Sequence, residues 1–188
     1  MEKISVMIVE DDVFWQKQLA TDLGKENDID VVFIASTKEQ AVEAAQLLDP
    51  DIILMDIHLT HFRYDGLEAA KEMFRTGKVS GKIIIISSES DKDVIIKAFQ
   101  HGATNYLTKY CLMDILQAIR EAYYDHSSIH FDVAHIIRNE LRLMVLTPSE
   151  REVYDLSLKG FNKTQISESM QKSFNTIKTQ WKSIKSKL

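Results

Sequence analysis

Four short apolar runs, each ending in polar or charged residues, constrain the fold of this 188-residue chain more than any other feature. The runs lie at residues 4–9, 50–56, 82–86 and 103–107. Near-continuous apolar runs of this length are typical of strands buried on both faces of a parallel sheet. In an open parallel sheet the functional crevice lies outside the carboxyl ends of the strands. We therefore expect the residues that end the four runs to meet at one site.

These run ends supply three carboxylates, a hydroxyl and an ammonium. Asp11 and Asp12 follow the first run, Asp56 ends the second, Ser87 follows the third and Lys109 comes shortly after the fourth. Carboxylate oxygens suit a divalent cation such as Mg²⁺, and a lysine ammonium suits phosphate. The run ends therefore predict a site for a divalent cation and a phosphoryl group.

Helical spacing of apolar residues fills the intervals between the runs. Helices are expected at residues 13–25, 38–48, 67–75, 91–101 and 112–124, and a further strand at residues 29–35. Five strands in strict alternation with five helices predict an α/β doubly wound parallel sheet over residues 1–124. The expected strand order is 2-1-3-4-5, with the switch point beside strands one and three.

The remainder of the chain is predicted to be all-α. Residues 125–145 contain a polar stretch and a helix from Ile129 to Val145, which we interpret as a linker. Residues 146–188 predict a small domain whose helices lie at residues 149–159, 163–170 and 175–188. Short helices joined by a tight turn, with a lysine-rich last helix, match a helix-turn-helix.

The charge composition of the tail also differs from that of the rest of the chain. Residues 144–188 carry eight Lys or Arg and four Asp or Glu, whereas residues 1–143 carry 15 Lys or Arg and 24 Asp or Glu. An acidic body with a basic tail favours a nucleic-acid partner for the tail. No apolar run approaches the roughly 20 residues of a membrane helix, and no signal peptide is evident. The single cysteine, Cys111, excludes an intramolecular disulfide, so we expect a cytoplasmic protein without a membrane partner.

Several motifs, taken in their order along the chain, resemble those of one protein family. The receiver-type residues are Asp11, Asp12, Asp56, Ser87, Tyr106 and Lys109. The tail matches at residues 146–153, 160–163, 173–178 and 184–188. With these residues the chain resembles two-component response regulators of the NarL/FixJ type, which join a flavodoxin-like receiver domain to a LuxR-type helix-turn-helix.

The resemblance implies a role for each receiver residue. Asp56 accepts a phosphoryl group from a sensor histidine kinase, as a carboxylate nucleophile. The implied Mg²⁺ ligands are Asp11, Asp12, Asp56 and the backbone carbonyl of His58. The implied phosphoryl-binding and switch residues are Ser87, Lys109 and Tyr106, which changes rotamer when the site is phosphorylated.

The resemblance also implies that the last helix enters the major groove of double-stranded DNA. The implied contacts to base edges are Lys178, Thr179 and Lys182. The implied contacts to phosphates are Thr164, Ser173 and Thr176, with Lys172, Lys185 and Lys187 adding affinity that depends on salt. A homodimer on two half-sites is expected.

The sequence departs from the family pattern in three places. The loop after Asp56 is about two residues longer than usual and has Thr60 where proline is common. Tyr110 follows Lys109 in place of proline, so a cis peptide is not expected there. We also expect a helix-turn-helix domain over residues 146–188 that lacks the usual final helix. We therefore predict that the receiver and linker form a weak dimer, tightened by phosphorylation.

Two other classes of function remain open. The chain could be a phosphorelay protein or a phosphorylation-independent regulator whose tail binds protein instead of DNA. Steep salt dependence of duplex binding separates this class from a DNA-binding regulator. An α/β phosphohydrolase needs a second carboxylate two residues after its nucleophile. His58 occupies that position here, so we do not expect an enzyme.

Overall fold

The structure, a computed structural model, describes residues 3–60, 64–109, 112–126 and 128–188. The chain divides into two compact units, Met1–Ala134 and His135–Leu188. This division falls inside residues 125–145, the segment that the sequence analysis interpreted as a linker. Tyr110, before which no cis peptide is expected, lies outside the described residues, as do Cys111 and residues 61–63 of the loop after Asp56.

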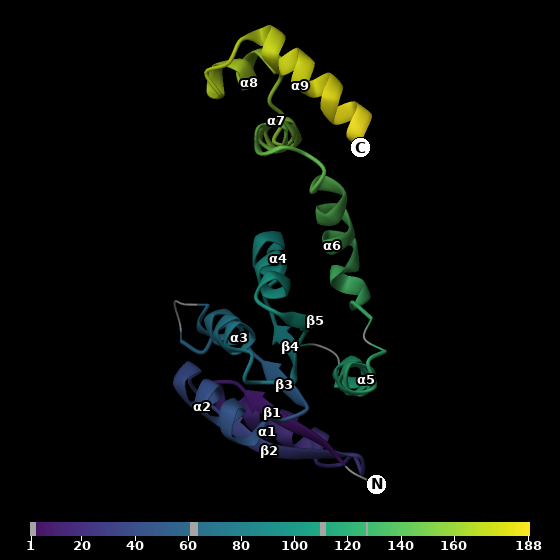
Figure 1. Ribbon diagram of the computed structural model, residues 1–188. Coiled ribbons are helices and arrows are strands. Elements are labelled where there is room, and N and C mark those ends of the chain that lie inside the picture. Colours follow the sequence, from purple (N-terminus) through teal and green to yellow (C-terminus); the bar gives the residue numbers. More distant parts are fainter. Residues whose placement is uncertain (1–2, 61–63, 110–111, 127) are drawn as a thin grey trace. The chain divides into compact units, whose positions relative to one another are not determined.

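Five parallel strands form the sheet of the first unit, in the order β2-β1-β3-β4-β5 (Figure 1). They are β1 (Ile4–Val9), β2 (Ile29–Ala35), β3 (Ile52–Met55), β4 (Lys82–Ser87) and β5 (Ala103–Thr108). The predicted doubly wound sheet and its strand order are confirmed. All of β3, and all of β4 except Lys82, is buried. Burial on both faces explains why these two runs contain almost no polar residue.

Five helices connect or follow these strands. They are α1 (Val13–Leu23), α2 (Lys38–Leu48), α3 (Asp65–Thr76), α4 (Lys92–Gln100) and α5 (Leu112–Tyr123). Their ends lie within two residues of the predicted ends. Side-chain caps define several of the starts, because a cap satisfies backbone N–H groups that have no partner within the helix. Asp12 accepts a hydrogen bond from the Phe14 amide, and Asp91 caps α4 in the same way.

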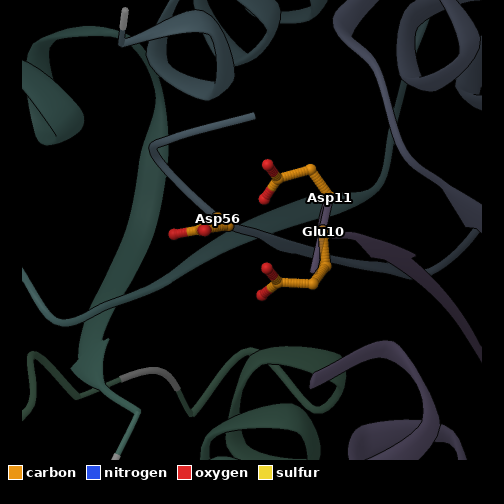
Figure 2. A group of neighbouring side chains, drawn as sticks. All are labelled: Glu10, Asp11 and Asp56. Atoms are coloured by element: carbon orange, nitrogen blue, oxygen red, sulfur yellow. The ribbon is translucent and has the colours of Figure 1, made fainter. Parts of the chain in front are cut away.

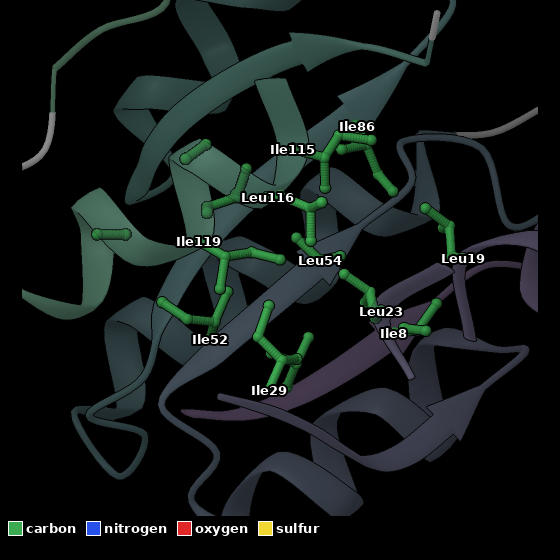
Figure 3. Packing of buried hydrophobic residues seen from close by; sticks show 14 of the residues in the cluster. Ile8, Leu19, Leu23, Ile29, Ile52, Leu54, Ile86, Ile115, Leu116 and Ile119 are labelled. Atoms are coloured by element: carbon green, nitrogen blue, oxygen red, sulfur yellow. The ribbon is translucent and has the colours of Figure 1, made fainter. Parts of the chain in front are cut away.

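One face of the sheet packs against α1 and α5 (Figure 3). Ile8, Leu54 and Ile86 of the strands contact apolar side chains of the two helices. The helix side chains labelled in Figure 3 are Leu19 and Leu23 of α1, and Ile115, Leu116 and Ile119 of α5. Full burial of such a side chain contributes about 1.5–3 kcal/mol. This core fixes the carboxyl ends of β1 and β3 side by side.

The second unit is built from short helices. It contains α7 (Pro148–Leu158), α8 (Lys163–Ser169) and α9 (Phe174–Lys187), together with the end of α6 (Phe131–Leu143). Their common core consists of Leu143, Leu146, Val153, Ile166, Ile177 and Ile184. Capping boxes open α7 at Thr147 and α8 at Asn162. Among the described residues, no helix is long and apolar enough to cross a membrane.

The predicted linker is divided between the two units. Its first part is held against β5, because the Asn105 side chain donates to the carbonyl of Ser128 at 3.0 Å and accepts from the amide of His130 at 2.9 Å. Its last part joins the other core through Leu143. The segment therefore contributes to the packing of both units.

Candidate functional site

The carboxyl ends of the strands bring three acidic side chains together. Glu10 and Asp11 follow β1 and Asp56 follows β3, and Figure 2 shows their carboxylates gathered at one place. One ligand oxygen from each residue lies within 4.8 Å of the others. Oxygen ligands at this spacing suit a small divalent cation. The structure therefore contains an acidic cluster that could bind a metal.

Lys109, which follows β5, supplies the positive charge of the site. Its Nζ lies 2.6 Å from Oε2 of Glu10 and 3.0 Å from Oδ2 of Asp56. Burial disfavours the ammonium, but the hydrogen bond to Glu10 and the negative charge of Asp56 outweigh it and raise the pKa of Lys109. Burial also raises the pKa of Glu10 to about 7, although the hydrogen bond from Lys109 opposes this shift.

Asp56 is held rigidly at the base of this site. Only 5% of the residue is exposed. Its amide donates to the carbonyl of Val9 at 2.8 Å, and its Oδ1 accepts from the amide of Ile57 at 2.7 Å. Its Oδ2 faces Lys109. A pocket of about 370 Å³ opens above these groups, so a small anionic group has room to reach the carboxylate.

Gly66, the second residue of α3, allows the backbone to pass close to Asp56. Its amide donates to the carbonyl of Ile57 at 3.0 Å. A Cβ atom at this glycine would lie 1.8 Å from the carbonyl oxygen of Asp56, which no side chain tolerates. The glycine therefore sets the position of the backbone that carries Asp56.

Ser87 and Tyr106 are both buried next to the turn after β4. The Ser87 hydroxyl accepts a hydrogen bond from the Glu89 amide at 3.2 Å, and the Tyr106 hydroxyl donates to the Glu89 carbonyl at 2.8 Å. Burial raises the pKa of Tyr106. Both side chains are thus tied to the same residue of this turn.

Asp12, which the resemblance implies as a metal ligand, lines the pocket but lies outside the cluster of three carboxylates. Its carboxylate caps α1 by accepting from the Phe14 amide at 2.7 Å, and Glu10 is the third member of the cluster. The Glu10 amide still pairs with Ala35 of β2 at 3.0 Å, so the first of three consecutive acids is held by the sheet. The sequence alone does not show which two of the three adjacent acids, Glu10, Asp11 and Asp12, join Asp56 in the cluster.

Other side chains complete the pocket wall. They are Asp12, Trp15, His58, Thr60 and Ser88. The ring of His58 lies 5.1 Å from that of Tyr64. Trp15 and Ser88 were not singled out from the sequence. Ser88 directly follows β4, which is the signal that could have identified it, whereas Trp15 is the third residue of α1 and carries no such signal.

The predicted DNA-contacting residues of the tail fall into two groups. Exposed side chains on α9 are Thr176, Lys178, Thr179, Lys182 and Lys185, and Thr164 is exposed on α8. By contrast, Lys172 donates to the hydroxyl of Ser149, and Nζ of Lys187 lies 2.6 Å from Oε2 of Glu150. Ser173 caps α9, accepting from the Thr176 amide at 3.1 Å.

Residues 6–120 match the model of the response regulator receiver domain, which is more than half of the chain. The chain belongs to the response regulators. The matched segment includes the acidic cluster, Asp56 and Lys109, and so covers the whole candidate site.

Two relatives extend the similarity of this response regulator into its tail. The transcriptional regulatory protein LiaR of Bacillus subtilis is 32% identical over 194 residues, covering 98% of this chain and 90% of LiaR. The response regulator protein VraR of Staphylococcus saprophyticus is 29% identical over 191 residues, covering 98% of this chain and 90% of VraR. The predicted NarL/LuxR type of response regulator is therefore confirmed.

A solved structure supports the fold of the response regulator. The RcsB response regulator of Salmonella typhimurium, whose structure was determined to study DNA interaction, aligns with a TM-score of 0.65 and 20% identity. The alignment covers 100% of this chain and 93% of that one. At this identity the match shows a shared fold.

Proposed function

We propose that this response regulator is a DNA-binding transcription regulator controlled by phosphorylation of Asp56. The observation that carries the proposal is the placement of the Asp56 carboxylate, buried and 3.0 Å from the Lys109 ammonium, beside Glu10 and Asp11. Such a set binds a transferring phosphoryl group and balances its charge. The donor in the cell is the phosphohistidine of a sensor kinase.

Phosphoryl transfer needs a nucleophile and charge compensation at this site. A carboxylate oxygen of Asp56 forms a bond to phosphorus while the phosphorus–nitrogen bond of the donor histidine breaks, and the imidazole leaves with the electron pair. The Lys109 ammonium compensates charge on the phosphoryl oxygens, and Ser87 donates its hydroxyl to them. The donor set of Glu10, Asp11 and Asp56 fits Mg²⁺, which neutralises phosphoryl charge when it is bound. The carbonyl of His58 is the proposed further ligand.

The switch in this proposal runs from Ser87 to Tyr106. Both side chains are hydrogen-bonded to the backbone of Glu89. Movement of Ser87 toward a phosphoryl group therefore changes the turn that holds the Tyr106 hydroxyl. Two arrangements of this turn provide the bistable element that phosphorylation biases. The altered surface then tightens a weak homodimer.

The tail is the proposed DNA-binding part. We assign residues 1–124 to the receiver, 125–145 to the connection and 146–188 to the helix-turn-helix. Helix α9 presents Lys178, Thr179 and Lys182 as exposed side chains, which suits the major groove. LiaR and RcsB, by their names, act in transcription or interact with DNA. A regulator of this kind works in the cytoplasm, where kinase and DNA are accessible.

The test is Mg²⁺-dependent labelling by acetyl phosphate, followed by intact mass measurement. The wild type is expected to gain one phosphoryl group, and Asp56→Asn is expected to gain none, because the amide is not a nucleophile. Asp51→Asn is the matched control, since Asp51 bonds to Ser5 and lies outside the pocket. A wild type without label, or a labelled Asp56→Asn protein, overturns the proposal.

A further inference from the structure

Trp15, the third residue of α1, lines the pocket above Asp56 and has no role in the proposed function. The centroid of its ring lies 5.4 Å from Nζ of Lys109. The face of an aromatic ring attracts a cation, and the attraction grows when water is excluded. The Lys109 side chain is only 10% exposed, so this contact forms in partly desolvated surroundings.

The helical turn that carries Trp15 is fixed to the sheet. The amide side chain of Gln16 donates to the carbonyl of Glu10 at 2.7 Å and to the hydroxyl of Ser36 at 2.9 Å. Asp12 caps the same turn, and the ring of Phe14 packs edge-on against that of Trp15 at 5.8 Å. The indole therefore has a defined position at the pocket wall.

The two anionic partners of Lys109, Glu10 and Asp56, compete for its ammonium. When Asp56 becomes an acyl phosphate, its carboxylate charge is lost and the charge of the phosphoryl oxygens replaces it. Glu10, at 2.6 Å, then competes with the phosphoryl oxygens for the ammonium. The ring of Trp15 attracts the ammonium in both states, since its charge distribution does not change on phosphorylation.

We propose that Trp15 is a positioning residue of the phosphoryl-acceptor site, whose ring holds the Lys109 ammonium within reach of the phosphoryl oxygens. This inference rests on the proposed function. With acetyl phosphate as donor, an Asp56 oxygen bonds to phosphorus as the bond to the acetyl oxygen breaks and acetate leaves with the electron pair. Lys109 keeps its proton throughout, so Trp15 affects only where the positive charge lies.

The first test compares initial labelling rates with acetyl phosphate in Mg²⁺. Trp15→Leu removes the ring, and a cation–ring contact of ordinary strength predicts a rate about twofold to thirtyfold lower. Trp15→Phe keeps an aromatic face and should restore most of the rate. Trp181→Phe is the control, because it removes the chain's other indole, which packs in the second unit and does not line the pocket, and its rate should equal that of the wild type.

The second test is spectroscopic. The chain has two tryptophans, so a Trp181→Phe background leaves Trp15 as the single emitter. Exchange of Lys109 for Met in this background should shift the emission of Trp15, because a charge next to the indole is removed. This measurement also decides the matter if Trp15→Leu does not fold.

The outcomes separate the two proposals. Three outcomes would overturn the positioning role alone, provided that the wild type is labelled. The first is a labelling rate of Trp15→Leu equal to that of the wild type, and the second is a rate of Trp15→Phe as low as that of Trp15→Leu. The third is a Trp15 emission that Lys109→Met does not change. A wild type that takes no label would overturn the proposed function and the positioning role with it.

Discussion

The ammonium of Lys109 lies 3.0 Å from Oδ2 of Asp56, although 53 residues separate the two in the chain. The pairing of β3 with β4 and of β4 with β5 brings them together at one edge of the sheet. The same ammonium also contacts Glu10 from β1. One lysine thus joins the ends of three strands, and the predictions below depend on this arrangement.

Glu10 should make stability fall as the pH rises. Its pKa is raised from 4.5 to about 7, so between these values the folded state binds more protons than the unfolded state. Stability then decreases with pH across this window, by up to about 3 kcal/mol. Chemical denaturation without Mg²⁺ at pH 5 and pH 7 measures the effect. Glu10→Gln should lose the pH-dependent difference, and an unchanged difference would contradict the assignment.

Gly66→Ala should disable the site. The new Cβ meets the carbonyl oxygen of Asp56 at 1.8 Å, so the backbone that carries the nucleophile must move. We expect a destabilisation of about 1–3 kcal/mol and labelling at least about tenfold slower, because small displacements of reacting groups have large effects on rate. Gly24→Ala, at the end of α1 and away from the pocket, should label normally. Normal labelling of Gly66→Ala would count against the close approach.

Glu150 should protect the tail against acid. Hydrogen bonds from Lys187, Ser183 and the Thr147 amide lower its pKa to about 2. A lowered pKa gives stability that is present above pH 4.5 and is lost as the pH falls toward 2. In a Trp15→Phe background, which leaves Trp181 as the single emitter, Glu150→Gln should therefore unfold the tail at a higher pH in an acid titration followed by fluorescence. Coincident titrations of variant and wild type would refute this role.

The lysines of the tail should differ in their effect on DNA binding. Lys178→Ala and Lys182→Ala remove exposed charges, so each should lower the slope of log affinity against log salt by up to about 1. Lys187→Ala, whose ammonium is bound to Glu150, should leave the slope nearly unchanged and lower the thermal midpoint instead. Slopes for Lys178→Ala and Lys182→Ala that equal the wild-type slope would show that the exposed face of α9 does not contact DNA.

The sequence predicted the sheet well because buried parallel strands leave a clear apolar signal. The runs at residues 4–9, 50–56 and 82–86 became β1, β3 and β4 in the expected order. The helices were found as well, and their ends agree with the predicted ends to within two residues. Strand ends also located Asp56 and Lys109 correctly at one edge.

The sequence alone did not predict which distant side chains contact each other. The choice between Glu10 and Asp12 depends on which acid the sheet still holds and which one caps the helix. The ion pair between Lys187 and Glu150 depends on how α7 and α9 pack, since the two residues are 37 positions apart in the chain. The contact of Trp15 with Lys109 likewise exists only after the sheet has formed. Distant contacts of this kind leave no periodic trace in a sequence.

Control of DNA affinity through Asp56 is central to the proposed function. The most direct measurement is the affinity for a duplex that the protein has selected from a random pool, with and without beryllofluoride, which mimics the acyl phosphate, in Mg²⁺. The wild type should bind about tenfold more tightly with beryllofluoride, a typical allosteric coupling, and Asp56→Asn should not respond. Equal affinity in both conditions, for a wild type that demonstrably binds beryllofluoride, would contradict the claim.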